Sequence, residues 1–131
     1  MSDYNLLCDD ENVCYEDSFC KLTPTSLILK TYYIPTGNDK TIELTAIQMV
    51  YYKKQKIAHD LLKIKPWGMN LSSIWWGCDK LRNVHCNNKY NVVIDTGKAI
   101  KKGFSVSNIE EFLEKLKERL PSEIPFLNDL P

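Results

Sequence analysis

Cysteine and histidine side chains are the first candidates for chemistry in this sequence, and they are few. Cys78, His85 and Cys86 could supply three ligands to a zinc ion, but the C-x2-C pair of a closed zinc site is missing. A cysteine nucleophile could use His59 as its base. His59 is next to Asp60, however, and sequence neighbours point apart on a strand. We therefore predict no metal, no cofactor and no catalytic residue.

The glycine motifs of phosphate binding and of serine hydrolysis are missing as well. The five glycines form no G-x-x-x-x-G-K-[ST], no G-x-G-x-x-G and no G-x-S-x-G. A small enzyme whose pocket the sequence does not reveal stays as an alternative to a binding function.

The cysteines favour a reducing compartment. There are five of them, an odd number, at positions Cys8, Cys14, Cys20, Cys78 and Cys86. The N-terminus has neither a basic start nor an apolar run, so we find no secretory signal. We expect free thiols and a cytoplasmic protein.

Lysines cluster most tightly at Lys53, Lys54 and Lys56, directly after Tyr51 and Tyr52. We expect a charged turn there, with its side chains projecting together from one end of the domain. A basic residue near an anionic membrane contributes about 1 kcal/mol of attraction. These lysines therefore suggest a peripheral phospholipid-binding site, whereas nucleic acid is the least favoured partner.

Three tryptophans occur within one short segment, as Trp67, Trp75 and Trp76. Adjacent residues on a strand point to opposite faces, so Trp75 and Trp76 cannot both belong to the core. Tryptophan is enriched among the residues that dominate binding energy in protein interfaces. The exposed member of this pair is thus a candidate anchor for a protein or peptide partner.

Charge is distributed unevenly along a chain whose net charge is zero. Residues 1–20 hold six acidic residues and no lysine or arginine, so 17 basic residues accompany 11 acidic ones in the rest of the chain. We predict a flexible acidic leader over residues 1–13, which shields a basic face of the domain or docks on a partner.

Between residues 14 and 106 the pattern predicts about seven short strands separated by turns. Ile42 and Leu44 alternate with polar residues, and the phase then slips so that Ile47, Met49 and Tyr51 take the other parity. A slip of one residue exchanges the buried face, which indicates a bulge or sharp bend near Ala46.

A C-terminal amphipathic helix is the clearest element. Ser107 and Glu110 form a capping box. Apolar residues then follow at helical spacing, and Pro121 ends the helix. This face consists of Ile109, Phe112, Leu113, Leu116 and Leu120.

The stretch from Lys101 to Leu116, with its Phe104-Ser105-Val106-Ser107-Asn108-Ile109-Glu110 step, resembles the last strand and helix of bacterial-type pleckstrin-homology-like domains. The resemblance implies an α+β, mainly β fold: a bent antiparallel barrel of about seven strands, closed by the C-terminal helix. The domain would span residues 14–120, with a tail over 121–131 that packs back or hangs free.

One departure from that family bears on function. Phosphoinositide-binding members carry a basic cluster along the first two strands and the loop between them. Here the equivalent turn, residues 23–25, is short and uncharged, with only Lys21 and Lys30 nearby. We therefore predict a non-catalytic interaction module that binds a protein or peptide, with anionic phospholipid binding as the alternative. The candidate ligand-binding residues are Lys53, Lys54, Lys56, Trp75 and Trp76.

Overall fold

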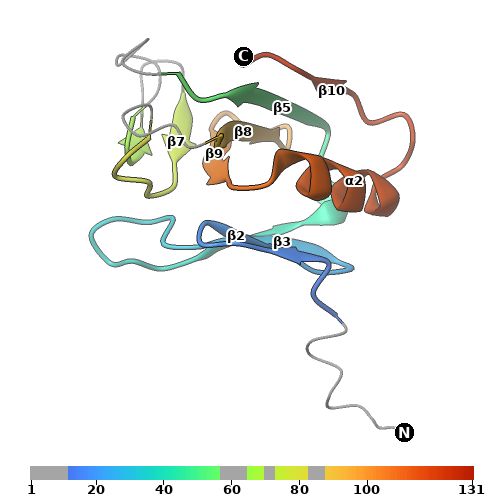
Figure 1. Ribbon diagram of the computed structural model, residues 1–131, viewed down its shortest axis with the longest axis horizontal. Coiled ribbons are helices and arrows are strands. Elements are labelled where there is room, and N and C mark those ends of the chain that lie inside the picture. Colours follow the sequence, from blue (N-terminus) through green and yellow to red (C-terminus); the bar gives the residue numbers. More distant parts are fainter. Residues whose placement is uncertain (1–11, 57–64, 70–72, 83–87) are drawn as a thin grey trace, which may run out of the picture.

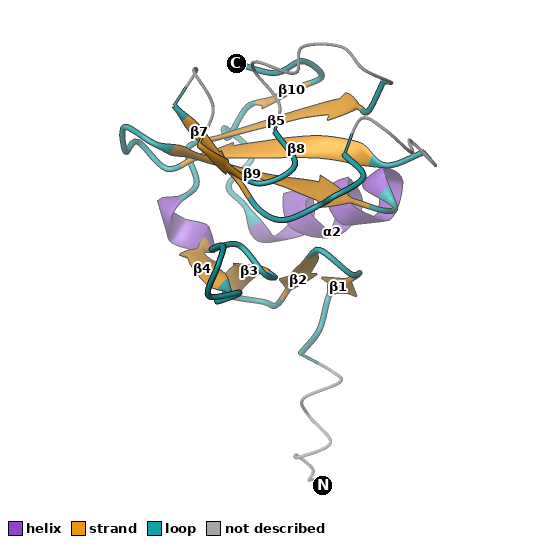
Figure 2. Cartoon of the chain, turned by 90° about the vertical axis from the view of Figure 1, so that its left-hand side faces the viewer, coloured by secondary structure: helices purple, strands orange, loops and turns teal. Residues whose placement is uncertain are grey.

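Two β-sheets face each other in the computed structural model, with one helix between them (Figures 1 and 2). The structure describes residues 12–56, 65–69, 73–82 and 88–131. The smaller sheet contains four consecutive antiparallel strands, β1 (Tyr15–Glu16), β2 (Cys20–Leu22), β3 (Ser26–Leu29) and β4 (Lys40–Glu43).

The larger sheet has six strands in the order β10-β5-β8-β9-β7-β6. Strand β10 runs parallel to β5 and β7 runs parallel to β9, while the other neighbours are antiparallel. Its strands are β5 (Met49–Lys54), β6 (Gly68–Met69), β7 (Ile74–Trp76), β8 (Tyr90–Asp95), β9 (Lys101–Val106) and β10 (Phe126–Leu127).

The predicted closed, seven-stranded antiparallel barrel is wrong. Over the described residues, no strand of one sheet pairs with a strand of the other, so the sheets form two separate layers. The chain passes from β4 to β5 through the 3-10 helix η1 (Leu44–Ala46), and this helix produces the phase slip expected near Ala46. The edge of β5 is then covered by β10 rather than by the first sheet, so the barrel does not close.

Along β5, the residues that face the core differ from those expected. Ile47 is buried as predicted, but Val50 and Tyr52 face the space between the sheets. Tyr51 packs on the opposite face of the larger sheet. The tail that the sequence left undecided packs back, because β10 lies within it.

Apolar side chains form one main core and one smaller cluster. The main core lies between the sheets and against the helix; its fully buried members include Leu22, Leu27, Leu29, Val50, Val92, Ile94, Val106, Phe112 and Leu116. The smaller cluster, Ile74, Trp76 and Val93, covers the other face of the larger sheet. Because both faces of β8 are covered, its buried-type run Val92-Val93-Ile94 is buried throughout.

The helix α2 (Ile109–Arg119) begins one residue later than predicted. Its N-cap is Asn108, whose side chain accepts a hydrogen bond from the Glu111 amide at 3.2 Å. The Ser107 amide instead donates to the carboxylate of Asp17, and the Asn108 amide donates to the Tyr15 hydroxyl. The start of the helix is therefore fixed by β1 and the residue that follows it.

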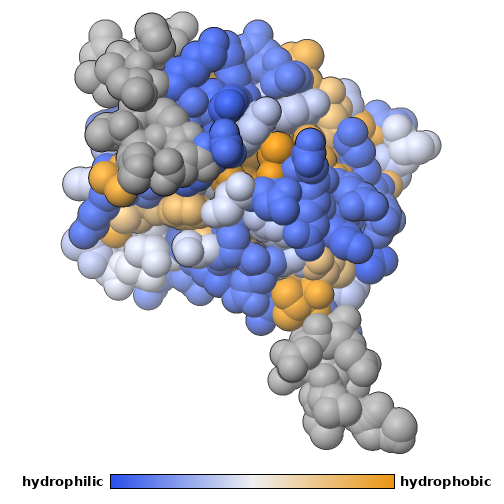
Figure 3. Space-filling view, in the orientation of Figure 1, coloured by the Kyte–Doolittle hydropathy of each residue, from blue (hydrophilic) through white to orange (hydrophobic). Residues whose placement is uncertain are grey.

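The predicted apolar face of α2 is confirmed. Phe112 and Leu116 are fully buried, Leu120 is nearly so, and Ile109 and Leu113 pack against the same core. Hydrophilic side chains cover the opposite, outward face (Figure 3). Within the described residues, no helix combines the length and apolar character needed to cross a membrane.

Candidate functional site

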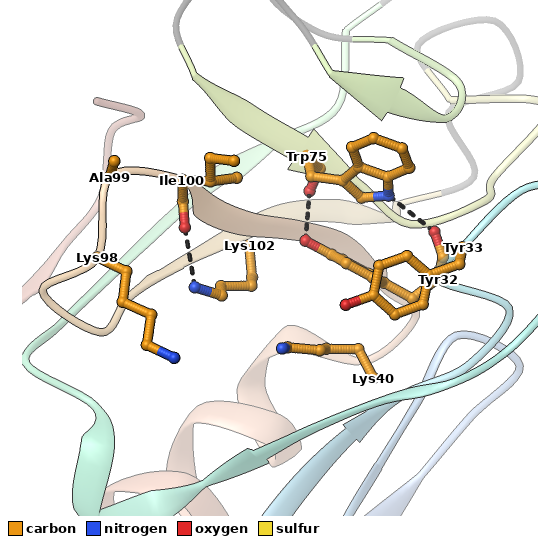
Figure 4. Close-up of a pocket in the computed structure, with 8 residues that line it drawn as sticks. All are labelled: Tyr32, Tyr33, Lys40, Trp75, Lys98, Ala99, Ile100 and Lys102. Carbon is orange, nitrogen blue, oxygen red and sulfur yellow. Dashed lines mark hydrogen bonds between the residues drawn. The ribbon is translucent and has the colours of Figure 1, made fainter.

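A pocket of about 320 Å³ opens between the two sheets, beside the start of β4 (Figure 4). Aromatic rings form one wall and lysines another, and we call it the lysine–aromatic pocket. It is lined by Tyr32, Tyr33, Lys40, Trp75, Lys98, Ala99, Ile100 and Lys102.

The aromatic wall is fixed by a reciprocal pair of hydrogen bonds. The indole N–H of Trp75 donates to the Tyr32 carbonyl at 2.9 Å, and the Tyr32 hydroxyl donates to the Trp75 carbonyl at 3.1 Å. The Tyr33 ring lies 5.0 Å from the Tyr32 ring and 6.1 Å from Trp75, centroid to centroid. Burial raises the pKa of Tyr32, so its hydroxyl stays a neutral donor. These contacts hold the three rings of the wall together.

Lys102 is the buried lysine of the pocket. On β9 it shares the parity of Phe104 and so points into the space between the sheets, where it is buried. Its ammonium group donates to the Ile100 carbonyl at 2.8 Å and to the Thr96 hydroxyl at 3.2 Å.

Lys40 and Lys98 complete the lysine wall from β4 and from the β8–β9 turn, and their side chains point toward one another (Figure 4). Burial lowers the pKa of Lys102, and the charges of Lys40 and Lys98 lower it further, whereas Asp95 acts weakly in the opposite sense. No aspartate or glutamate is among the pocket residues. Three ammonium groups thus share a site without an acidic partner in its lining, which suits an anionic group.

A second cluster of polar side chains packs against the larger sheet, and we call it the buried polar network. It contains Gln55, Asp79, Arg82, Lys89, Asn91 and Ser105. Asp79 accepts hydrogen bonds from Lys89 and Ser105, and Arg82 stacks on the ring of Trp76 with its guanidinium carbon 4.7 Å from the ring centroid. Its members bind one another and the main chain. The network therefore connects the loop before β8 to the larger sheet.

The three lysines that the sequence analysis singled out do not line the lysine–aromatic pocket. Lys53 and Lys54 lie within β5 rather than in the expected turn, and neighbouring positions on a strand face opposite ways. Lys53 pairs with Asp129 at 3.3 Å, and Lys56 is exposed beyond the strand. Lys54 is opposite Tyr90, at the far end of β8 from the β8–β9 turn.

Trp75 and Trp76 lie on opposite faces of β7, as predicted. Trp75 is partly exposed and lines the lysine–aromatic pocket. Trp76 is fully buried in the smaller apolar cluster and does not reach the pocket. Of the two, Trp75 is therefore the member available to a ligand.

Some of the candidate metal and nucleophile positions are among the described residues. Cys14, Cys20 and Cys78 are free thiols, and burial raises the pKa of Cys20. Among the residues that the structure describes, no three His, Cys, Asp or Glu side chains gather as metal ligands. His59, His85 and Cys86 lie outside the described residues.

Sequence reasoning missed Tyr32, Tyr33, Lys40, Lys98 and Lys102 as a site. One signal was present, since Lys102 has the inward parity of the apolar residues that follow it on the same strand. A lysine on the core-facing side of a strand indicates that the core ends there and a pocket begins.

No family model, no curated protein and no solved structure matches this chain. The resemblance of the last strand and helix to pleckstrin-homology-like domains thus stays a hypothesis.

Proposed function

We propose that this domain is a non-catalytic interaction module that binds an acidic segment of a protein or peptide partner in the lysine–aromatic pocket. The observation that carries the proposal is the convergence of Lys40, Lys98 and Lys102 beside the ring of Trp75, with no acidic residue among the lining side chains.

Charge supplies the first part of the argument. Burial lowers the pKa of Lys102, and the charges of Lys40 and Lys98 lower it further, so its ammonium form is at a disadvantage until an anion arrives. A carboxylate placed among the three lysines would relieve that repulsion. Its attraction would also exceed that of a fully exposed ion pair, because water is partly excluded.

The aromatic wall supplies the second part. Tyr33 and Ile100 are exposed and Trp75 is partly exposed, and all three line the pocket. Apolar side chains of a partner gain about 25 cal/mol for each Å² that they bury here. Together the two walls favour a segment in which acidic and apolar side chains occur close together.

A soluble decapeptide of alternating glutamate and valine tests the proposal by the change in tryptophan fluorescence, since the peptide has no tryptophan. We expect binding that weakens as salt rises from about 0.05 to about 0.5 M. Lys98→Glu should weaken it at least about tenfold, and a decapeptide of alternating lysine and valine should not bind. Lys54→Glu is the matched control, because Lys54 is also exposed but lies at the far end of the sheet. Equal effects of the two substitutions would contradict the proposed site.

The phospholipid alternative predicts a different pattern. Vesicles rich in anionic lipid would bind through Lys53 and Lys54, and the double substitution Lys53→Glu with Lys54→Glu would abolish sedimentation with them. The structure gives this alternative less support, because Lys53 is paired with Asp129. We expect the double variant to bind the acidic peptide as the wild type does.

A further inference from the structure

The outer edge of β4 borders the lysine–aromatic pocket. Over the described residues β4 is the last strand of its sheet and has β3 as its sole strand neighbour. Its first residue, Lys40, lines the pocket, and the β8–β9 turn that carries Lys98 lies across the gap (Figure 4). A strand edge and an anion site therefore adjoin.

The register shows which main-chain groups of β4 face outward. The amide of Leu44, directly after β4, donates to the carbonyl of Thr25, directly before β3, at 3.0 Å, and this bond continues the β3–β4 register. Main-chain groups alternate in direction along a strand of an antiparallel ladder. Thr41 and Glu43 therefore direct their amides away from β3, and their exposed side chains leave both positions open.

We infer that the acidic segment binds as an extended strand added to the outer edge of β4. This inference rests on the proposed function and specifies how the same site is occupied. A strand added there would lie about 4.8 Å from β4 and would exchange main-chain hydrogen bonds with Thr41 and Glu43. Every second side chain of that strand would point between the sheets, toward Lys98 and Lys102.

Charge selects an acidic partner over a second copy of the chain at this edge. Pairing of β4 with another β4 would bring two sets of Lys40, Lys98 and Lys102 together, and like charges across a strand pair are destabilising. Lysine at an edge strand is a common protection against such self-pairing. An acidic strand reverses the sign of that interaction and binds where a copy of the chain is repelled.

Glu43→Pro tests the main-chain contact with little disturbance of the fold. Glu43 has φ −71°, which is already within the range that proline imposes. Its amide points away from β3, so proline removes an outward donor without removing a bond of the sheet. Glu43→Ala is the matched control, because it removes the same carboxylate and keeps the amide. We expect Glu43→Pro to bind the glutamate–valine decapeptide about tenfold more weakly than Glu43→Ala, with unchanged unfolding midpoints.

Two N-methylated forms of the same decapeptide provide a second test that needs no variant. In an added strand, only one alternate set of peptide amides faces β4. Methylation of that set should abolish binding and methylation of the other set should not, although both peptides keep every charge. In hydrogen exchange, the amides of Thr41 and Glu43 should gain protection when the unmodified peptide binds.

The possible outcomes separate the two proposals. If both methylated peptides bind like the parent and Glu43→Pro matches Glu43→Ala, strand addition is refuted while the acidic-segment site stands. If the unmodified peptide does not bind, or if Lys98→Glu leaves its binding unchanged, both proposals are refuted.

Discussion

Replacing Arg82 with alanine removes five hydrogen bonds from the interior of the protein at once. The Arg82 guanidinium donates to the carbonyls of Lys65, Pro66 and Gly77. It also donates to the side chains of Asn91 and Ser105. Burial lowers the pKa of Arg82 to about 10, so the group is still charged at neutral pH. Arg82 thereby connects the main chain at Lys65, Pro66 and Gly77 to side chains of β8 and β9.

The expected loss of stability follows from the groups left behind. Without Arg82, three carbonyls lose a charged donor and Asp79 keeps Lys89 as its remaining charged partner. Each buried or partly buried carbonyl that loses its donor costs about 1–3 kcal/mol. The stacking of Arg82 on Trp76 adds up to about 2 kcal/mol when desolvated, although water entering the space returns part of the loss. We expect a net loss of about 4 kcal/mol, a large share of the stability of a domain of this size.

Urea unfolding followed by tryptophan fluorescence measures this loss. With a slope of about 2 kcal/mol per molar urea, the midpoint of Arg82→Ala should fall by about 2 M. Arg82→Lys should recover part of the loss, because lysine keeps the charge but not the planar fork of donors. Lys80→Ala, at an exposed neighbouring position, should stay within about 0.5 kcal/mol of the wild type. A loss below about 1 kcal/mol for Arg82→Ala would refute the structural role of the buried polar network.

Three further predictions concern the core and its response to acid. Leu116→Ala should destabilise the protein by about 2–5 kcal/mol in urea melts, because Leu116 is fully buried between helix and sheets; a loss below about 0.5 kcal/mol would mean that α2 is not docked. Gly103→Ala should cost about 1–3 kcal/mol or prevent folding, because its Cβ would lie 2.5 Å from an atom of the Trp76 ring, and a neutral result would contradict that packing. Burial acts to raise the pKa of Asp79, but hydrogen bonds from Lys89 and Ser105 and the charge of Arg82 outweigh it, so the pKa lies below its usual value. The ionised form therefore stabilises the fold above about pH 4, and this contribution is lost as pH falls through the lowered pKa. Asp79→Asn should flatten the decline in unfolding free energy below about pH 4, and parallel pH profiles of variant and wild type would refute this assignment.

Local patterns predicted the elements well where one face of an element is buried. The spacing of Phe112 and Leu116 located α2, and the adjacency of Trp75 and Trp76 predicted that the two rings face opposite ways. However, the N-cap of α2 is Asn108 rather than the predicted Ser107. Contacts from β1 and its neighbouring loop, far away in the sequence, occupy the amides there.

Topology was not accessible from local patterns. The barrel prediction failed because β10 contains only two residues and still covers the edge of β5, and because β7 enters the sheet parallel to β9. Nothing in the spacing of apolar residues distinguishes a parallel from an antiparallel neighbour for strands this short.

The site was mislocated for a related reason. Lys53, Lys54 and Lys56 are close in sequence, whereas the pocket gathers Lys40 and Lys102 from strands of different sheets. Proximity along the chain is a poor guide to proximity in space once strands pair across long loops.

Trp75 and Trp76 are adjacent in the sequence, but their surroundings place different constraints on the two positions. Trp75 lines the lysine–aromatic pocket, whereas Trp76 is enclosed by Gly103, Arg82 and the outer cluster of the larger sheet. Among descendants of this sequence, position 76 should therefore stay tryptophan, with glycine retained at 103. Under the proposed function, position 75 should vary together with the lysines around it when the partner changes.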